Sequence, residues 1–254
     1  MDACAFCQQP FGSDRIRTGE HAAPNWCRLL LPDRGKAEHI LIVETDRGLT
    51  VERRGLRNPF TTVVEEVCEP CNNGWMKELE DSCEGLLGHF IQGHERHIRY
   101  WRQVLAATWA AKTAFVWDLI SPEDRAIPDK DLKILHRALR PTAQQQVWIG
   151  RYAGDDPHTF RRAAAHVVGA TDPDPRNAHA YLVALSVGQL ALVVFGQHVV
   201  RPPYSHPLPE RFALQLVQIS PPIHEIVAWP PPNALDDETL EACVRSLGAP
   251  ISKT

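Results

Sequence analysis

Net charge, long apolar runs and secretory features are all scarce in this chain of 254 residues. The net charge is only −4 and charged residues make up 23% of the chain, which is the composition of a folded protein rather than a disordered one. The longest apolar stretch with almost no charge, residues 180–200, contains Ser186, Gln189 and Gln197, which a membrane helix would seldom tolerate. The opening MDACAFCQQP lacks the basic and apolar segments of a signal peptide. We therefore expect a soluble, cytoplasmic protein that has no membrane partner.

Paired cysteines are the most informative feature that is present. The chain has seven cysteines, and cytoplasmic thiols stay reduced, so clustered cysteines favour a metal site over disulfides. Four of them form two C-x-x-C pairs: Cys4 and Cys7, and Cys68 and Cys71. Four thiolates are the ligands of a structural Zn²⁺ site, which is what this pattern predicts. The remaining cysteines are scattered, and we expect small buried thiols at these positions: Cys27, Cys83 and Cys243.

The periodicity of apolar residues predicts both strands and helices. Strands are expected at residues 40–44, 49–53, 61–67, 145–152, 181–187, 190–195 and 212–219. Helices are expected at residues 75–88, 100–119, 129–140 and 236–247. Lys112 is the only charged residue between Val104 and Val116, which predicts a helix that is buried on most of its surface.

The order of these elements around the cysteines indicates a treble clef. The first pair lies in a turn-rich segment, and the second pair follows a β-branched strand and directly precedes a helix. A zinc knuckle, then strands, then a helix whose start carries the other two ligands is the treble-clef layout. We therefore predict the α+β fold class, with an N-terminal treble-clef zinc module in residues 1–92 and a mixed α+β domain in residues 93–254.

Two further motifs accompany the cysteines. Glu20-His21-x-x-Pro24 lies between the pairs, and Asn72 directly follows the second pair. Together with the C-x-x-C pairs, this pattern resembles the HNH endonucleases, the ββα-metal group. More narrowly, EHxxPxW with CxxCNNGWMxxLE resembles a set of bacterial HNH-type proteins that are largely uncharacterised. The resemblance covers roughly the first 90 residues, and for residues 93–254 we expect a role in substrate choice, self-association or regulation.

The resemblance implies a metal-dependent endonuclease that hydrolyses nucleic-acid phosphodiesters, with DNA favoured over RNA. His21 would activate water, a role that suits a neutral imidazole. Glu20 and Asn72 would hold one Mg²⁺ or Mn²⁺ ion through oxygen, while Zn²⁺ at the cysteines would be structural. Single-motif HNH proteins either nick or cut both strands as dimers, so a homodimer stays open.

Several of these residues also have a structural interpretation. Asn72 and Asn73 are residue types that cap helices, because the Asn side chain accepts from free backbone amides. Many HNH proteins orient the catalytic His with a further Asn or His before the second cysteine pair, and Asn58 is the nearest polar candidate in this chain.

A basic cluster precedes the second cysteine pair. It would contact phosphate if the protein binds nucleic acid, and otherwise it is a solvated surface. Its members are Arg53, Arg54 and Arg57. Two alternatives to an endonuclease also stay open. One is a non-catalytic treble-clef module that binds nucleic acid or protein, and the other is a structural zinc domain that anchors an unrelated C-terminal activity.

Overall fold

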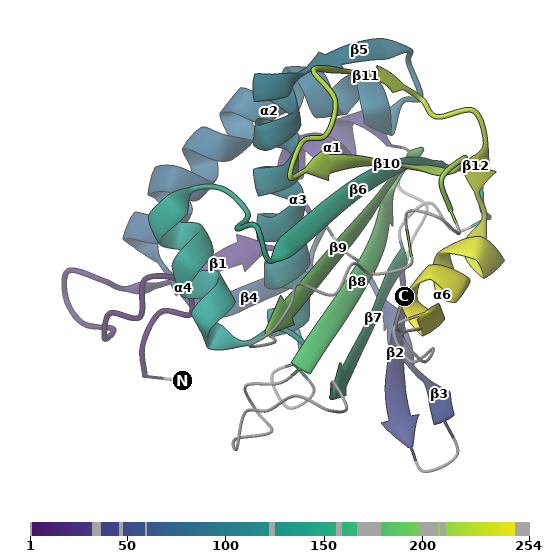
Figure 1. The fold of residues 1–254 in the computed structure, drawn as a ribbon. Helices are drawn as coiled ribbons and strands as arrows, with labels where there is room; N and C mark the ends of the chain where they lie inside the picture. The colour runs from purple at the N-terminus through teal and green to yellow at the C-terminus, as the bar shows by residue number, and fades with distance from the viewer. Residues whose placement is uncertain are drawn as a thin grey trace.

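The computed structural model describes most of the chain, and the account below concerns those residues only. They are 2–31, 37–45, 48–58, 60–121, 125–155, 159–166, 179–198, 208 and 212–246. The fold class is α+β, as predicted: a large central sheet has helices on both faces, and an N-terminal cysteine cluster lies beside it (Figure 1).

Eight strands form the central sheet of the described chain. They are β2 (Ala37–Thr45), β3 (Gly48–Arg57), β6 (Gln145–Tyr152), β7 (Thr159–His166), β8 (His179–Val187), β9 (Leu190–His198), β10 (Leu216–Ser220) and β12 (Ala234–Leu235). The strand order is β10-β6-β9-β8-β7-β2-β3, and β12 pairs with β6. The β2–β7 and β6–β12 pairs are parallel, and the other pairs are antiparallel.

Both faces of the sheet are buried along the strands whose side chains the structure describes, such as β8 and β9. Along β8, Tyr181 and Val183 belong to one apolar core and the alternating Leu182 and Ala184 belong to the other. Successive side chains of a strand point to opposite faces, so a strand buried on both faces is a continuous apolar run. The central sheet is therefore the middle layer of the molecule.

Helices provide the two outer layers. The first layer includes α2 (Lys77–Ile91) and α3 (Tyr100–Leu119), with α4 (Asp129–Ala138) packed against α3. The opposite face is covered by α6 (Asp237–Arg245), which contacts β7 and β8 (Figure 1). The side chain of Asp236 caps α6 by accepting from the amide of Thr239 at 2.8 Å.

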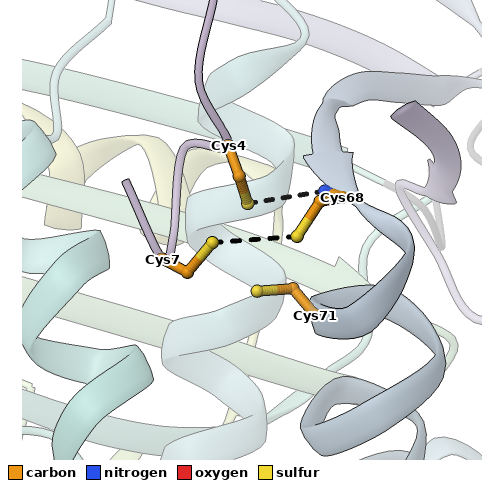
Figure 2. A group of neighbouring side chains, drawn as sticks. All are labelled: Cys4, Cys7, Cys68 and Cys71. Carbon is orange, nitrogen blue, oxygen red and sulfur yellow. Dashed lines mark hydrogen bonds between the residues drawn. The ribbon is translucent and has the colours of Figure 1, made fainter. Parts of the chain in front are cut away.

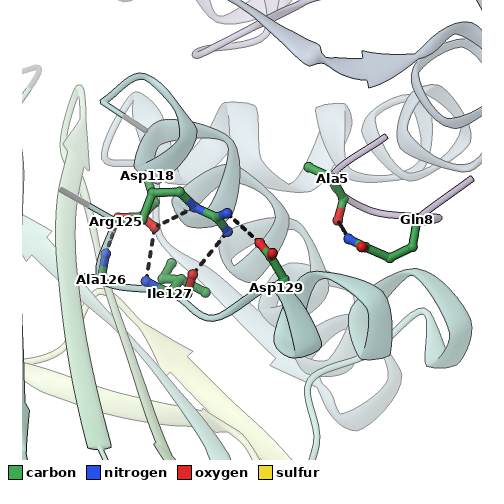
Figure 3. A network of polar contacts seen from close by, with 7 residues as sticks. All are labelled: Ala5, Gln8, Asp118, Arg125, Ala126, Ile127 and Asp129. Atoms are coloured by element: carbon green, nitrogen blue, oxygen red, sulfur yellow. Dashed lines mark hydrogen bonds and ion pairs between the residues drawn. The ribbon is translucent and has the colours of Figure 1, made fainter. Parts of the chain in front are cut away.

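A buried carboxylate fixes the connection between α3 and α4 (Figure 3). Asp118, at the end of α3, accepts hydrogen bonds from the amides of Ala126 and Ile127, both at 3.0 Å. Arg125 forms ion pairs with Asp118 and Asp129, and it donates to the carbonyl of Ile127 at 3.0 Å. The buried charge of Asp118 is thus compensated by a cation and by backbone donors.

The N-terminal region has a ββα arrangement. Strand β1 (Arg17–His21) pairs antiparallel with β4 (Val63–Cys68), and the short helix α1 (Asn25–Leu30) follows β1. After β4 the chain enters η1 (Cys71–Met76), a π-helical turn that leads into α2. A second two-stranded sheet pairs β5 (Arg96–Arg99) with β11 (Ile226–Trp229).

The expected boundary between residues 92 and 93 does not separate two sheets. Strands β2 and β3 precede that boundary, yet β2 pairs with β7 from the second segment. One apolar core also contains residues of both segments. The two segments share a sheet and a core, while the functional division into 1–92 and 93–254 stays a prediction.

The predicted helices and strands agree best with the structure where the pattern of apolar residues is long. The predicted bounds of α3 and β6 are those observed. The helix predicted to stop at Gly88 continues to Ile91, and residues 212–215 form a turn before β10 rather than part of the strand. Strands β1, β5, β7 and β11 were not predicted, because each is short or lacks β-branched alternation and is stabilised by its pairing partner.

Candidate functional site

A tight turn brings Cys4 and Cys7 together. The amide of Gln8 donates to the carbonyl of Cys4 at 2.9 Å, and the amide of Cys4 donates to the carbonyl of Gln9 at 3.0 Å. Gln8 adopts a left-handed backbone conformation with φ of 60°, and its side chain donates to the carbonyl of Ala5 (Figure 3). This reversal of the chain points both sulfurs to one side (Figure 2).

The second cysteine pair lies where β4 ends and η1 begins. Cys68 is the last residue of β4 and Cys71 is the first of η1, so the change from strand to helix turns both sulfurs toward the first pair. The four sulfurs all lie within 4.8 Å of one another (Figure 2). The amide of Cys68 also donates to the sulfur of Cys4 at 3.4 Å, a contact that favours a thiolate.

This donor set fits a structural zinc ion. Zinc in structural sites takes four tetrahedral ligands, and four cysteine sulfurs are a complete set. Three of the cysteines are buried and Cys7 is half-buried, as is usual for the ligands of a structural site. The prediction that these four cysteines form one cluster is confirmed.

The thiols of the cluster compete for protons. A hydrogen bond from Cys71 lowers the pKa of Cys4 to about 4, and the same bond raises the pKa of Cys71. Burial raises the pKa of Cys7. A divalent cation would replace these protons, since zinc binds thiolates and its binding releases protons.

His21 is the last residue of β1, opposite Val63 of β4. It is half-buried, and its Nδ1 atom is buried without a hydrogen-bond partner. Asn58 does not orient it: the Asn58 side chain accepts from the amide of Phe60 at 2.9 Å, and its carbonyl accepts from the amide of Thr62. The residue suggested by the sequence as an orienting group is therefore part of the turn before β4.

Asn72 joins the start of η1 to β1. Its side-chain nitrogen donates to Thr18 Oγ1 and to the carbonyl of Gly19, both at 3.3 Å. Neither Asn72 nor Asn73 caps the helix, which corrects that alternative: η1 has no side-chain cap, and the Asn73 nitrogen instead donates to Glu69. Within the described residues, Oδ1 of Asn72 accepts no hydrogen bond, so an oxygen is available on the side chain that contacts Thr18 and Gly19 of β1.

Glu20 lies in a buried ion cluster with Lys112 and Glu80. Its carboxylate is 2.5 Å from Nζ of Lys112, which also pairs with Glu80 of α2. The Lys112 side chain is 1% exposed and that of Glu20 is 7% exposed. Burial raises the pKa of Glu20. Burial also lowers the pKa of Lys112, but the two carboxylates outweigh it and leave the pKa raised.

This cluster bears directly on the expected oxygen site for a second ion. A metal ion at Glu20 would share that carboxylate with Lys112, which pairs with its Oε1 atom, whereas Oδ1 of Asn72 accepts no hydrogen bond within the described residues. Lys112 and Glu80 were not anticipated as partners of Glu20. The one signal in the sequence was the single charge in an otherwise apolar helix, since buried charges require partners.

The arginine cluster lies on β3, at one edge of the central sheet. The side chains of Arg53, Arg54 and Arg57 fall outside what the structure describes, so their contact with phosphate stays a prediction.

The three remaining cysteines are buried, as expected. Burial raises the pKa of Cys83 to about 12 and also raises that of Cys27, so both thiols are unreactive at neutral pH.

Comparison of the chain with protein-family models, with curated proteins and with solved structures finds no match in any of the three. In the part of the chain that the structure describes, no helix combines the length and the apolar character needed to span a bilayer.

Proposed function

We propose that this protein is a zinc-stabilised HNH-type endonuclease that hydrolyses phosphodiesters, with DNA as the favoured substrate class. One observation carries the proposal. The ββα arrangement that gathers the four cysteines also joins the start of η1 to β1 through the Asn72 side chain, which donates to Thr18 and Gly19, and β1 then continues to Glu20 and His21. A reducing cytoplasm would suit the protein, because zinc ligation requires free thiolates.

In this proposal His21 is the general base. Its imidazole accepts the proton of the attacking water, a task that suits a side chain whose ordinary pKa is near neutrality. Zinc at the cysteines holds the turn, β4 and η1 together, and this fixes Asn72 relative to β1.

A hard divalent cation, Mg²⁺ or Mn²⁺, fits this site through Asn72. Such ions take oxygen ligands, keep several waters and are bound through one or two carboxylates together with substrate phosphates, so Asn72 would hold the ion together with the Glu20 carboxylate and the phosphate. When bound, the ion would neutralise negative charge that develops on the phosphate. Glu20 would serve both cations, because Lys112 pairs with its Oε1 atom and the carboxylate has a second oxygen for the ion.

The same ion cluster favours a second candidate, a non-catalytic treble-clef module that binds nucleic acid. The case for metal-dependent hydrolysis is weaker if Lys112 keeps the Glu20 carboxylate from the ion. Binding of nucleic acid, in contrast, requires neither Glu20 nor a second ion. The two candidates differ in turnover and not in fold.

The test is cleavage of plasmid, linear duplex DNA, single-stranded DNA and RNA under Mg²⁺, Mn²⁺ and EDTA, with zinc content measured in each sample. We expect cleavage with Mg²⁺ or Mn²⁺, and we expect His21→Ala to reduce it by about 10²-fold or more while zinc is retained. Asn72→Ala should also reduce cleavage, and it should cost about 1 kcal/mol of stability through its lost hydrogen bonds.

The matched control is His224→Ala, because His224 is an exposed histidine to which the proposed mechanism assigns no role. Equal cleavage by His21→Ala and the wild type would exclude His21 as the base. Binding of nucleic acid without cleavage under any of these conditions would favour the binding module. Light scattering of the free and the DNA-bound protein tests the proposed homodimer.

A further inference from the structure

A positively charged cavity lies between α2 and α3, on residues that the proposed mechanism does not use. Its volume is about 350 Å³. Residues from α2, β5 and α3 line it: Ser82, Gly85, Leu86, His89, Arg96, Trp101, Arg102 and Leu105. No carboxylate is among them, although the chain as a whole has a net charge of −4.

The cations of this cavity are not neutralised by acids. Within the described residues no salt bridge involves Arg96 or Arg102, and Glu95 is the only acidic residue between His89 and Arg102. The Arg96 guanidinium instead lies 2.8 Å from Nε2 of His89, and burial and the charge of Arg96 lower the pKa of that imidazole. His89 therefore accepts from Arg96 and holds the guanidinium at the cavity without removing its charge.

An exposed aromatic side chain lies beside these cations. Trp101 is 59% exposed, which is unusual for the largest apolar side chain in a folded protein. The guanidinium of Arg102 is 4.9 Å from the centre of its ring. Tyr100, its neighbour in the first turn of α3, is 56% exposed.

The positive surface continues beyond this cavity. Arg96 also lines a second cavity of about 640 Å³, together with His97, Arg151, one acidic residue, Glu95, and the prolines that follow Trp229. Arg96 thus lies between two cavities, with cations on both sides of it. This arrangement suits an extended anion better than a compact one.

We propose that this surface, from Trp101 and Arg102 through Arg96 to Arg151, binds single-stranded nucleic acid. The guanidinium groups would contact successive phosphates, and an unpaired base would stack on Trp101, as in other proteins that combine cations with exposed aromatic rings. The inference deepens the proposed function, on which it rests, by naming unpaired strands as the form of nucleic acid that the protein holds.

The experiment measures binding of fluorescein-labelled oligo(dT) by anisotropy as a function of salt. A duplex of the same length and inorganic polyphosphate serve as competitors. All variants are made in the His21→Ala background without added Mg²⁺ or Mn²⁺, so that binding is read without cleavage. Zinc content and melting temperature confirm that each variant is folded.

We expect Trp101→Ala to weaken oligo(dT) binding by about tenfold, and Trp101→Phe to restore most of the loss. The double variant Arg96→Ala/Arg102→Ala should weaken binding by about tenfold or more and flatten its dependence on salt. The charge-matched control is Arg137→Ala/Arg140→Ala, two exposed arginines at the end of α4, which should bind as the parent does.

Unchanged binding by the Trp101 and Arg96/Arg102 variants would overturn the inference. So would tighter binding of the duplex than of oligo(dT), or loss of binding only when Arg53, Arg54 and Arg57 of β3 are neutralised. If polyphosphate displaces oligo(dT) equally well from the parent protein and from Trp101→Ala, the surface is a simple anion site and does not recognise an unpaired base. Binding that depends on these residues in a protein that cleaves nothing would uphold the inference and reject the endonuclease.

Discussion

The two ends of the paired strands β1 and β4 both place groups that can carry negative charge in the interior of the protein. Each end provides for the compensation of that charge in a different way. At the Cys68 end, four buried or half-buried sulfurs converge, and their thiolates could hold a metal ion supplied from outside the chain. At the other end, next to His21, the buried carboxylate of Glu20 is compensated by Lys112, a cation that the chain itself supplies. The zinc end joins segments within the first 76 residues, whereas the lysine end ties β1 and α2 to α3.

Because of this difference, the two ends depend on different conditions. A metal site depends on the supply of metal and on reduced thiols, and its binding energy is folding energy. A buried lysine needs no supply, but it must remain protonated and must keep both of its carboxylate partners. The candidate base, His21, lies at the lysine end, directly after Glu20 in β1.

The largest effect is expected at the zinc end. Cys71→Ser should lose zinc and cooperative folding together, because structural zinc contributes about 10–16 kcal/mol in small zinc-binding peptides. Elemental analysis should find about one zinc per wild-type chain and almost none in the variant, and circular dichroism should show loss of a sharp melting transition.

Cys83→Ala is the control for Cys71→Ser, since Cys83 is also buried but is not one of the four clustered cysteines. The Cys83→Ala variant should keep its zinc. Zinc-free wild-type protein that is reduced and melts as sharply as the zinc-loaded form would contradict the assignment.

A smaller loss is expected at the lysine end. Lys112→Met should destabilise the protein by about 3–5 kcal/mol, because it leaves Glu20 and Glu80 without their cation. Denaturant unfolding measures the loss, and zinc content should stay near that of the wild type.

The triple variant Lys112→Met/Glu20→Gln/Glu80→Gln separates charge from packing. It should recover part of the stability, because it removes the uncompensated carboxylates. If Lys112→Met unfolds at the wild-type denaturant concentration, the cluster does not hold the two regions together, and the comparison fails.

The smallest effect is a pH dependence confined to the lysine end. A base whose pKa is higher in the folded than in the unfolded state contributes its full stability below the unfolded value. For Lys112 that value is 10.5, and the contribution is lost as pH rises through the higher folded value.

The stability advantage of the wild type over Lys112→Met should therefore be constant near neutral pH and shrink above pH 10.5. Urea unfolding of both proteins across this range measures it. A constant advantage throughout would mean that Lys112 does not act through its charge.

The sequence predicted the zinc end far better than the lysine end. Two C-x-x-C pairs have few other uses in a reduced protein, so their convergence could be inferred without knowing the chain path. The Glu20–Lys112–Glu80 cluster depends on how α2 and α3 pack against β1, and no local spacing encodes that packing. The sequence instead offered Glu20 as a metal ligand, through its place beside His21.

The same distinction holds for the fold. Helix α3 was predicted to the residue, because it is long and almost wholly apolar. Strand β7 was not, since Thr159–His166 is rich in Ala and Arg, and its pairing with β8 and β2 decides its conformation.

The parallel pairing of β2 with β7 has a consequence for how the protein is made. Residues Ala37–Thr45 leave the ribosome long before Thr159–His166, so β2 and β3 form a hairpin whose inner edge has no partner during synthesis. Unpaired strand edges recruit other chains, and pairings between distant segments form slowly. A nascent chain stopped between these strands would therefore depend on chaperones, and fragments that end before β7 should aggregate even when their zinc site is complete.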